Sequence, residues 1–324
     1  MKTSTGISRR KLLQGAAGIG AAATSTLTKG LFASTQSCSQ FRNATRPVPR
    51  TLVLMCDRYH NQDYIRVSLD RLFKELGLPV DYTTNYYDLS TRLLQPYQLF
   101  IAFRDEMIWP GGYSSGSAEE GARQQQDGLE NPEEFPPEIP EHWMTEEQGQ
   151  AVSDFVKAGY GFYSMHNNAL VSRSSRGYRD VQGGVALGHA PVRPFMVRVV
   201  NKEHPITEGV KDFMITDEQF YATYDKDQKN ILLHSENLDG LVSYETGYPR
   251  NGVGRGAAVT GSAPGGVAAQ SLGTTSISGW AHDFGKGRVV FTAMGHTNDA
   301  MWQPEYFKLQ KNAVRWLLKM SRKA

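Results

Sequence analysis

The sequence predicts an α/β protein with a mostly parallel sheet and helices on both of its faces. Short continuous apolar runs, such as Thr51–Cys56 and Leu99–Phe103, are typical of strands that are buried on both faces. Between such runs, residues 64–76 and 145–157 repeat apolar side chains at helical spacing. Because strands that alternate with amphipathic helices favour a parallel sheet, we expect a single α/β domain over residues 50–320.

The first half of this domain has clear boundaries. We expect the helix over 64–76 to end at Gly77 and a short second strand to follow at Val80–Thr83. Residues 110–142 are rich in Gly, Ser, Gln, Glu and Pro, which predicts a long surface insertion. Thr145, with glutamates in the first turn after it, is a good start for the next helix.

The second half is less regular. We expect strands at 160–165, 193–200 and 287–292, and a Gly/Ser/Ala-rich loop over 247–279. A last amphipathic helix is expected at 305–320, because its apolar residues recur at helical spacing.

The N-terminal residues 1–33 have the order of an export signal. Ser8–Gln14 (SRRKLLQ) is a twin-arginine pattern, an apolar Ala/Gly-rich run follows, and small residues lie near Ser34. The apolar run is too short and Gly-rich for a span of about 20 residues, so no stable membrane span is expected. We expect twin-arginine export to the periplasm, with residues 34–49 as a linker.

Charge and cysteine content exclude several partners. Without the five cations of the signal, the chain carries 30 cations against 33 anions, so no basic surface favours nucleic acid. Cys38 and Cys56 form no CxxC pair, and Cys56 is expected in the core. No GxGxxG follows the first strand, which argues against a nicotinamide cofactor there.

Polar residues follow the predicted strands. Ligands bind beyond the carboxyl ends of strands in such sheets, so these segments are expected to share one rim. They are 57–60 (DRYH), 104–106 (RDE) with Trp109 nearby, 166–168 (HNN), 217–221 (DEQFY) and 295–297 (GHT). His204 is expected in a turn and His142 and His234 on the surface, while Ser164 is interpreted as a strand residue because no GxSxG surrounds it.

The order of several motifs resembles the ThuA-like (trehalose-utilisation) family over residues 50–320. They are GFxxxH at 161–166, GH at 188–189, HPITxG at 204–209, DExxY at 217–221, GKGRV at 285–289 and GHT at 295–297. The resemblance implies a three-layer, flavodoxin-like fold similar to class I glutamine amidotransferases. Where those enzymes have a nucleophilic cysteine, this chain has Ser164-Met165-His166, so an amidotransferase reaction is not expected.

We therefore expect an enzyme, a hydrolase, lyase or isomerase, that processes a sugar or keto-sugar by acid–base chemistry. The expected catalytic residues are His166, His296 and Glu218. The expected substrate-binding residues are His60, Asp57, Trp109, Asn167, Asp217, Tyr221 and Thr297.

Three alternatives or additions remain open. A divalent metal such as zinc, held by His60, His166 and Glu218, would give three ligands and an open position. A non-catalytic carbohydrate-binding accessory protein would need the same pocket. By family analogy, a sugar oxidoreductase is a candidate partner that supplies keto-sugars.

Overall fold

The described part of the chain is built around one large sheet. The computed structural model describes residues 48–110, 140–238, 243–244 and 271–320. Among these residues, nine strands form one sheet in the order β2-β1-β3-β6-β15-β14-β11-β8-β9. The predicted export signal, nearly all of the linker, and residues 111–139 of the predicted insertion lie outside the described residues.

Five neighbouring strands at one side of the sheet are parallel. They are β2 (Val80–Thr83), β1 (Thr51–Met55), β3 (Leu99–Phe103), β6 (Gly161–Met165) and β15 (Gly287–Thr292). All five were predicted, to within one residue at each end. Their continuous apolar sequence has a direct cause, because β1, β3 and β6 are buried at every position.

The other four strands extend the sheet in antiparallel fashion. They are β14 (Thr275–Phe284), β11 (Ile231–Glu236), β8 (Arg193–Val199) and β9 (Phe213–Asp217). Four antiparallel steps separate β9 from β15, so β9 runs in the same direction as β15 and its carboxyl end lies at the same rim. The α/β fold with a large sheet is confirmed. In this half, the sequence indicated only β8, as a strand over 193–200, and not the antiparallel direction.

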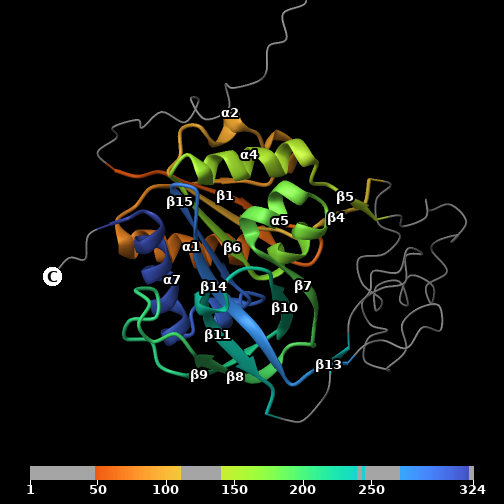
Figure 1. Cartoon of the computed structure of the whole chain (residues 1–324), viewed down its shortest axis with the longest axis vertical. Helices are drawn as coiled ribbons and strands as arrows, with labels where there is room; N and C mark the ends of the chain where they lie inside the picture. The colour runs from red at the N-terminus through yellow and green to blue at the C-terminus, as the bar shows by residue number, and fades with distance from the viewer. Residues whose placement is uncertain (1–47, 111–139, 239–242, 245–270, 321–324) are drawn as a thin grey trace, which may run out of the picture. The chain divides into compact units, whose positions relative to one another are not determined.

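Helices cover both faces of the parallel half. On one face, α1 (Gln62–Leu76), α6 (Asn298–Met301) and α7 (Pro304–Leu317) pack in a core that includes Val53 and Ile101. On the other face, α2 (Thr91–Leu94), α4 (Glu146–Lys157) and α5 (Arg176–Gln182) pack over Leu54 and Phe100 (Figure 1). Alternate side chains of each strand therefore supply two separate cores.

The predicted helices begin and end close to where the sequence placed them. Asn61 caps α1, and Gly77 ends it in the left-handed conformation at φ +66°. Thr145 and Gln148 cap α4 reciprocally, because each side chain bonds to the backbone N–H of the other. The last helix is shorter than expected and ends at Leu317 rather than 320.

Short elements complete the described chain. They are the 3₁₀ segments η2 (Tyr86–Asp88), η4 (His166–Arg173) and η5 (Gln228–Asn230), and the strands β4 (Met107–Ile108), β5 (Glu141–His142), β7 (Gly184–His189), β10 (Phe220–Tyr224), β12 (Ser243–Tyr244) and β13 (Ser271–Gly273). Strands β7 and β10 form an antiparallel pair beside η4. No helix in the described ranges is long and apolar enough to cross a membrane.

The predicted loop over 247–279 is wrong at its C-terminal end, because residues from 271 onward form β13 and the start of β14. Small residues are needed there for close packing. A Cβ on Gly279 would lie 3.0 Å from the Leu233 side chain on the neighbouring strand β11. The Ser and Gly content that indicated a loop thus reflects tight strand packing.

Candidate functional site

Four strand ends bring a group of histidines and acids together at one rim of the sheet. Asp57 and His60 follow β1, His166 follows β6, and His296 follows β15. Glu218 follows β9, the outermost strand of the antiparallel half. We call His60, His166, Glu218 and His296 the central cluster. One ligand atom from each of its members lies within 4.8 Å of all the others.

Asp57 fixes the orientation of His60. One oxygen of the buried Asp57 carboxylate lies 2.8 Å from His60 Nδ1, and the other accepts a 2.7 Å bond from the Asn167 amide. Burial alone would raise the pKa of Asp57, but the charge and hydrogen bond of His60 and two backbone N–H donors outweigh it and lower that pKa. Because the ionised carboxylate accepts the Nδ1 proton, the lone pair of His60 Nε2 faces the central cluster.

His166 lies at a strained turn directly after β6, where its backbone has φ +53°. The neighbouring turn accommodates it only because residue 295 is glycine, since a Cβ there would lie 3.1 Å from the His166 Cβ. His166 Nδ1 donates to the Ala293 carbonyl at 2.8 Å, which directs Nε2 to the cluster. Burial would lower the pKa of His166, but the nearby Glu218 carboxylate and the charge of Asp217 outweigh it and raise that pKa.

Glu218 contacts three histidines with its carboxylate. Its Oε2 lies 3.2 Å from His296 Nδ1 and 3.4 Å from His166 Nε2, and its Oε1 lies 3.4 Å from His189 Nδ1. Burial opposes ionisation, but the close imidazoles of His166 and His296 and the charge of His189 outweigh it and lower the pKa of Glu218. Glu218 is therefore a carboxylate at neutral pH.

Asp217 joins the turn after β9 to the turn after β15. Its buried carboxylate accepts backbone N–H bonds from Glu218 at 2.9 Å, Gly295 at 2.7 Å and His296 at 3.0 Å. These bonds tie the end of β9 to the end of β15, although three strands lie between them in the sheet. The antiparallel half must therefore curve back over the rim. Asp217 thus positions two cluster members, Glu218 and His296, through their backbone N–H groups.

The cluster is incomplete as a hydrogen-bonded network. His60 Nε2 and His296 Nδ1 lie 3.1 Å apart. His166 Nε2 and Glu218 Oε2 are both buried and make no hydrogen bond of good geometry with any described residue. Three imidazoles and one carboxylate of this kind are able to hold a metal ion or to transfer protons to a bound molecule.

Two site residues were missed in the sequence. His189, at the end of β7, reaches Glu218, and its ring stacks on Phe220 with the centroids 4.7 Å apart. Tyr64 on α1 has a buried hydroxyl without a hydrogen bond to any described residue. Burial, followed by the charges of Asp57, Asp217 and Glu218, raises the pKa of Tyr64 far above its usual value. The sequence offered a signal for His189, the Gly188-His189 motif of the family resemblance, and none for Tyr64.

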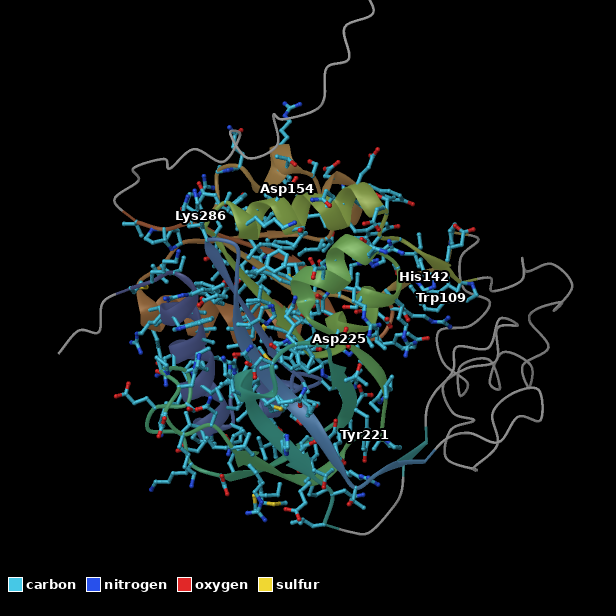
Figure 2. All side chains as sticks on the ribbon, viewed as in Figure 1. Trp109, His142, Asp154, Tyr221, Asp225 and Lys286 are labelled. Carbon is cyan, nitrogen blue, oxygen red and sulfur yellow. The ribbon has the colours of Figure 1, made fainter. Side chains whose placement is uncertain are left out.

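Three predicted substrate-binding residues lie outside the central cluster. Tyr221 donates its hydroxyl to Gln219 and the Gly273 carbonyl, at 3.2 Å each, whereas its neighbour Phe220 packs on His166. Thr297 caps α6. Trp109 packs edge-to-face on Tyr59 at 5.9 Å, and Figure 2 shows Trp109 and Tyr221 well apart.

The remaining predicted positions are structural or half-buried. His204 accepts the Ile206 backbone N–H in a turn, as expected, and Ser164 is a buried residue of β6. His142 has an exposed side chain, but it also lies 3.5 Å from the buried Glu106. Cys56 is only half-buried, in place of the expected core position, because the chain turns there at φ +77°.

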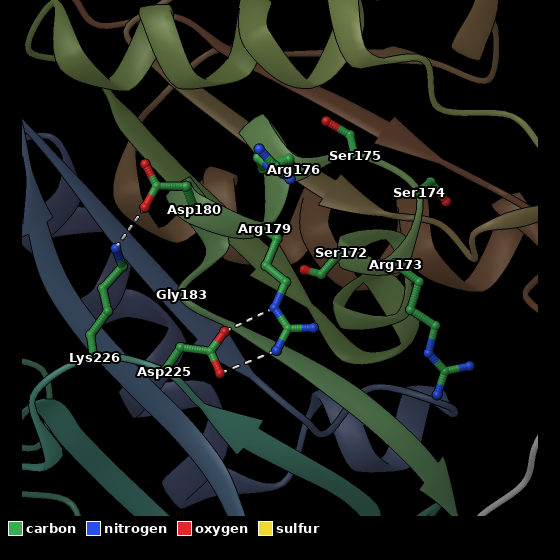
Figure 3. A pocket seen from close by; sticks show the side chains of 10 residues that line it. All are labelled: Ser172, Arg173, Ser174, Ser175, Arg176, Arg179, Asp180, Gly183, Asp225 and Lys226. Atoms are coloured by element: carbon green, nitrogen blue, oxygen red, sulfur yellow. Dashed lines mark hydrogen bonds and ion pairs between the residues drawn. The ribbon is translucent and has the colours of Figure 1, made fainter.

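A separate pocket of about 530 Å³ lies beside α5 and shares no residue with the cluster. Its lining includes Arg179, which forms a bidentate ion pair with Asp225. It also includes Lys226, which pairs with Asp180 (Figure 3). Since these cations are already neutralised, we do not assign the functional site to this pocket.

Comparison with known proteins agrees with this architecture. The model of the ThuA family, described as trehalose utilisation, matches residues 137–317, which is more than half of the chain. The chain belongs to this family. Its membership indicates a function related to trehalose utilisation. The matched segment contains His166, Glu218 and His296, whereas His60 lies before it.

Solved structures show the same fold. A protein from Bacteroides uniformis described as ThuA-like has a TM-score of 0.53 at 17% identity, covering 86% of this chain and 95% of its own. A second, from Parabacteroides merdae and described in the same way, has a TM-score of 0.52 at 15% identity, covering 86% and 93%. No curated protein matches the sequence.

Proposed function

We propose that this ThuA-family protein is an enzyme that processes a sugar or keto-sugar by proton transfer at the central cluster. The observation that carries the proposal is the convergence of three imidazoles and one ionised carboxylate, Glu218, at the rim where open α/β sheets bind ligands. Family membership supplies the carbohydrate class, and the cluster supplies the chemistry.

The residues have complementary parts in such a reaction. An imidazole carries or removes a proton near neutral pH, so His166 and His296 are suited to a carbon beside a carbonyl or to a glycosidic oxygen. Glu218, 3.2 Å from His296, orients the ring. Asp57, itself held by the Asn167 amide, orients His60 for contact with a substrate hydroxyl.

The setting of the reaction is also a proposal. The twin-arginine pattern in residues 1–33 supports export in the folded state, which cell fractionation with an Arg9→Lys, Arg10→Lys variant would test. A sugar oxidoreductase in the same compartment would supply the keto-sugar.

Turnover and binding should be measured separately on a panel of disaccharides and their 3-keto derivatives. We expect His296→Ala and Glu218→Gln to lower turnover by at least about 100-fold, the usual contribution of a positioned acid or base. His234→Ala serves as the control, because His234 is a half-buried histidine on β11 with no described contact to the central cluster. Full turnover in both cluster variants would contradict the proposal. Sugar binding without turnover of any panel member would instead favour the accessory carbohydrate-binding role.

A further inference from the structure

We propose that the central cluster binds one divalent transition-metal ion through His60 Nε2, His166 Nε2, His296 Nδ1 and a Glu218 oxygen. The inference rests on the proposed function in that both use this centre, but metal binding is measurable without any sugar. It adds His296 as a fourth ligand to the three that the sequence suggested.

The distances fit such an ion. Ligands at 2.0–2.2 Å from a metal lie about 3.3 Å apart in a tetrahedron and about 3.0 Å apart at neighbouring corners of an octahedron. The separations here are 3.1 Å for His60 to His296, 3.2 Å for Glu218 to His296 and 3.4 Å for Glu218 to His166. Both geometries remain compatible with the 4.8 Å limit of the whole set, after small side-chain shifts.

The outer contacts orient the lone pairs inward. A metal-binding histidine usually donates its other ring N–H to a carboxylate or backbone carbonyl. His60 Nδ1 bonds to Asp57, and His166 Nδ1 bonds to the Ala293 carbonyl. Asp57 is itself held by the Asn167 amide and by the Asp105 backbone N–H at 2.8 Å. Two ligands thus have the supporting contacts that are typical of metal centres.

Buried atoms without partners give independent support. His166 Nε2 and Glu218 Oε2 are buried and directed at the cluster without a good hydrogen bond among the described residues. Leaving such groups unsatisfied costs about 1–3 kcal/mol each. A single cation between them satisfies both atoms.

The donor types select the metal. Three imidazole nitrogens and one carboxylate suit zinc and its first-row neighbours, whereas Mg²⁺ and Ca²⁺ prefer oxygen ligands. Four protein ligands leave room for a water or sugar oxygen if the ion is five- or six-coordinate. With an ion bound, His166 Nε2 and the Glu218 oxygen would be ligands and would not transfer protons themselves. The ion would instead polarise a sugar carbonyl or lower the pKa of the bound water, and that water would carry the proton at the cluster.

The test is metal content followed by affinity. The full-length protein, purified without chelator and dialysed, is analysed by inductively coupled plasma mass spectrometry, and the chelator-treated protein is titrated calorimetrically with Zn²⁺, Mn²⁺, Co²⁺ and Mg²⁺. We expect one transition-metal ion per chain and no binding of Mg²⁺. His296→Ala, in the least buried ligand, and Glu218→Gln should weaken binding by more than 100-fold, while His234→Ala binds like the wild type.

A variant of Asp57, which positions His60, tests whether the contacts behind the ligands affect metal affinity rather than only folding. Asp57→Asn keeps the shape of the side chain but removes the carboxylate behind His60, so we expect a 10–100-fold loss of affinity. Wild-type protein that takes up less than about 0.1 ion per chain at saturating metal would overturn the inference, as would unchanged affinity in both ligand variants. Metal binding without sugar turnover would contradict only the proposed function.

Discussion

Replacing His282 with glutamine should reduce the loss of unfolding free energy that the protein shows at acid pH. His282 on β14 is buried, with Nε2 3.0 Å from the Val181 carbonyl and Nδ1 3.2 Å from the Tyr224 hydroxyl. Burial and then the charge of Lys226 lower the pKa of His282 from 6.5 to about 4. As the pH falls, the histidine of the unfolded chain is protonated before the buried histidine of the folded protein. The stabilisation that neutral His282 contributes is therefore complete above about pH 6.5 and is lost as the pH falls toward 4.

The size of the effect follows from the two pKa values. With pKa 4 in the folded and 6.5 in the unfolded state, linkage gives a loss of about 2.5 kcal/mol in the free energy of unfolding at pH 4.5 relative to pH 7.5. Glutamine does not titrate and retains one of the two hydrogen bonds, so His282→Gln should cost about 1 kcal/mol at pH 7.5. At pH 4.5 the variant should be the more stable protein.

Urea unfolding at pH 7.5, 5.5 and 4.5 measures this difference directly. Tyr224→Phe is the matched control, because it removes one hydrogen bond to the imidazole but leaves the buried titrating group, and it should retain most of the slope. Stability curves that run parallel in wild type and His282→Gln, within about 0.5 kcal/mol, would refute a buried neutral histidine at this position.

Three other substitutions test separate parts of the argument. Asp217→Asn cannot accept all three backbone N–H groups, so we expect a loss of about 2 kcal/mol in unfolding free energy and a parallel fall in turnover; unchanged turnover would show that Asp217 positions nothing. Tyr64→Phe removes a buried hydroxyl without a described partner, so thermal stability should change by less than about 0.5 kcal/mol while turnover drops about tenfold; a large stability loss would reveal a structural bond instead. Gly287→Ala would bring a Cβ within 2.1 Å of the Val156 carbonyl, so we expect a loss of about 3 kcal/mol in unfolding free energy by denaturant titration. Gly209→Ala meets open space but has φ +68°, so we expect a smaller loss of about 1–2 kcal/mol. Equal losses in the two variants would contradict the packing argument.

The parallel half of the fold could be predicted because its signals are local. Continuous apolar runs, a capping threonine at 145 and a terminating Gly77 each act on their own neighbours. In the antiparallel half β8 was predicted as a strand, but β9 and β14 were not, because burial alternates or small residues dominate there. Strand β9 has the burial pattern of an amphipathic strand, and β14 contains three small residues, Ser276, Ser278 and Gly279, that resemble a loop in sequence.

The candidate site was predictable only in part, for a related reason. The rule that ligands bind beyond strand ends found His60, His166 and His296, because each follows a recognisable strand. It did not find Tyr64, which projects from a helix, and it named Tyr221 where Phe220 is the ring against His166. A strand's two faces differ by one residue in sequence, and composition does not show which face meets the site.

The spacing of the cluster along the chain has a consequence for biosynthesis. His60 and His296 are 236 positions apart, yet their ring nitrogens touch across the rim. A ribosome-bound chain that stops before residue 296 therefore has an incomplete cluster, however well β1, β3 and β6 have paired. The four side chains meet only after β15 has been synthesised and has joined the sheet beside β6.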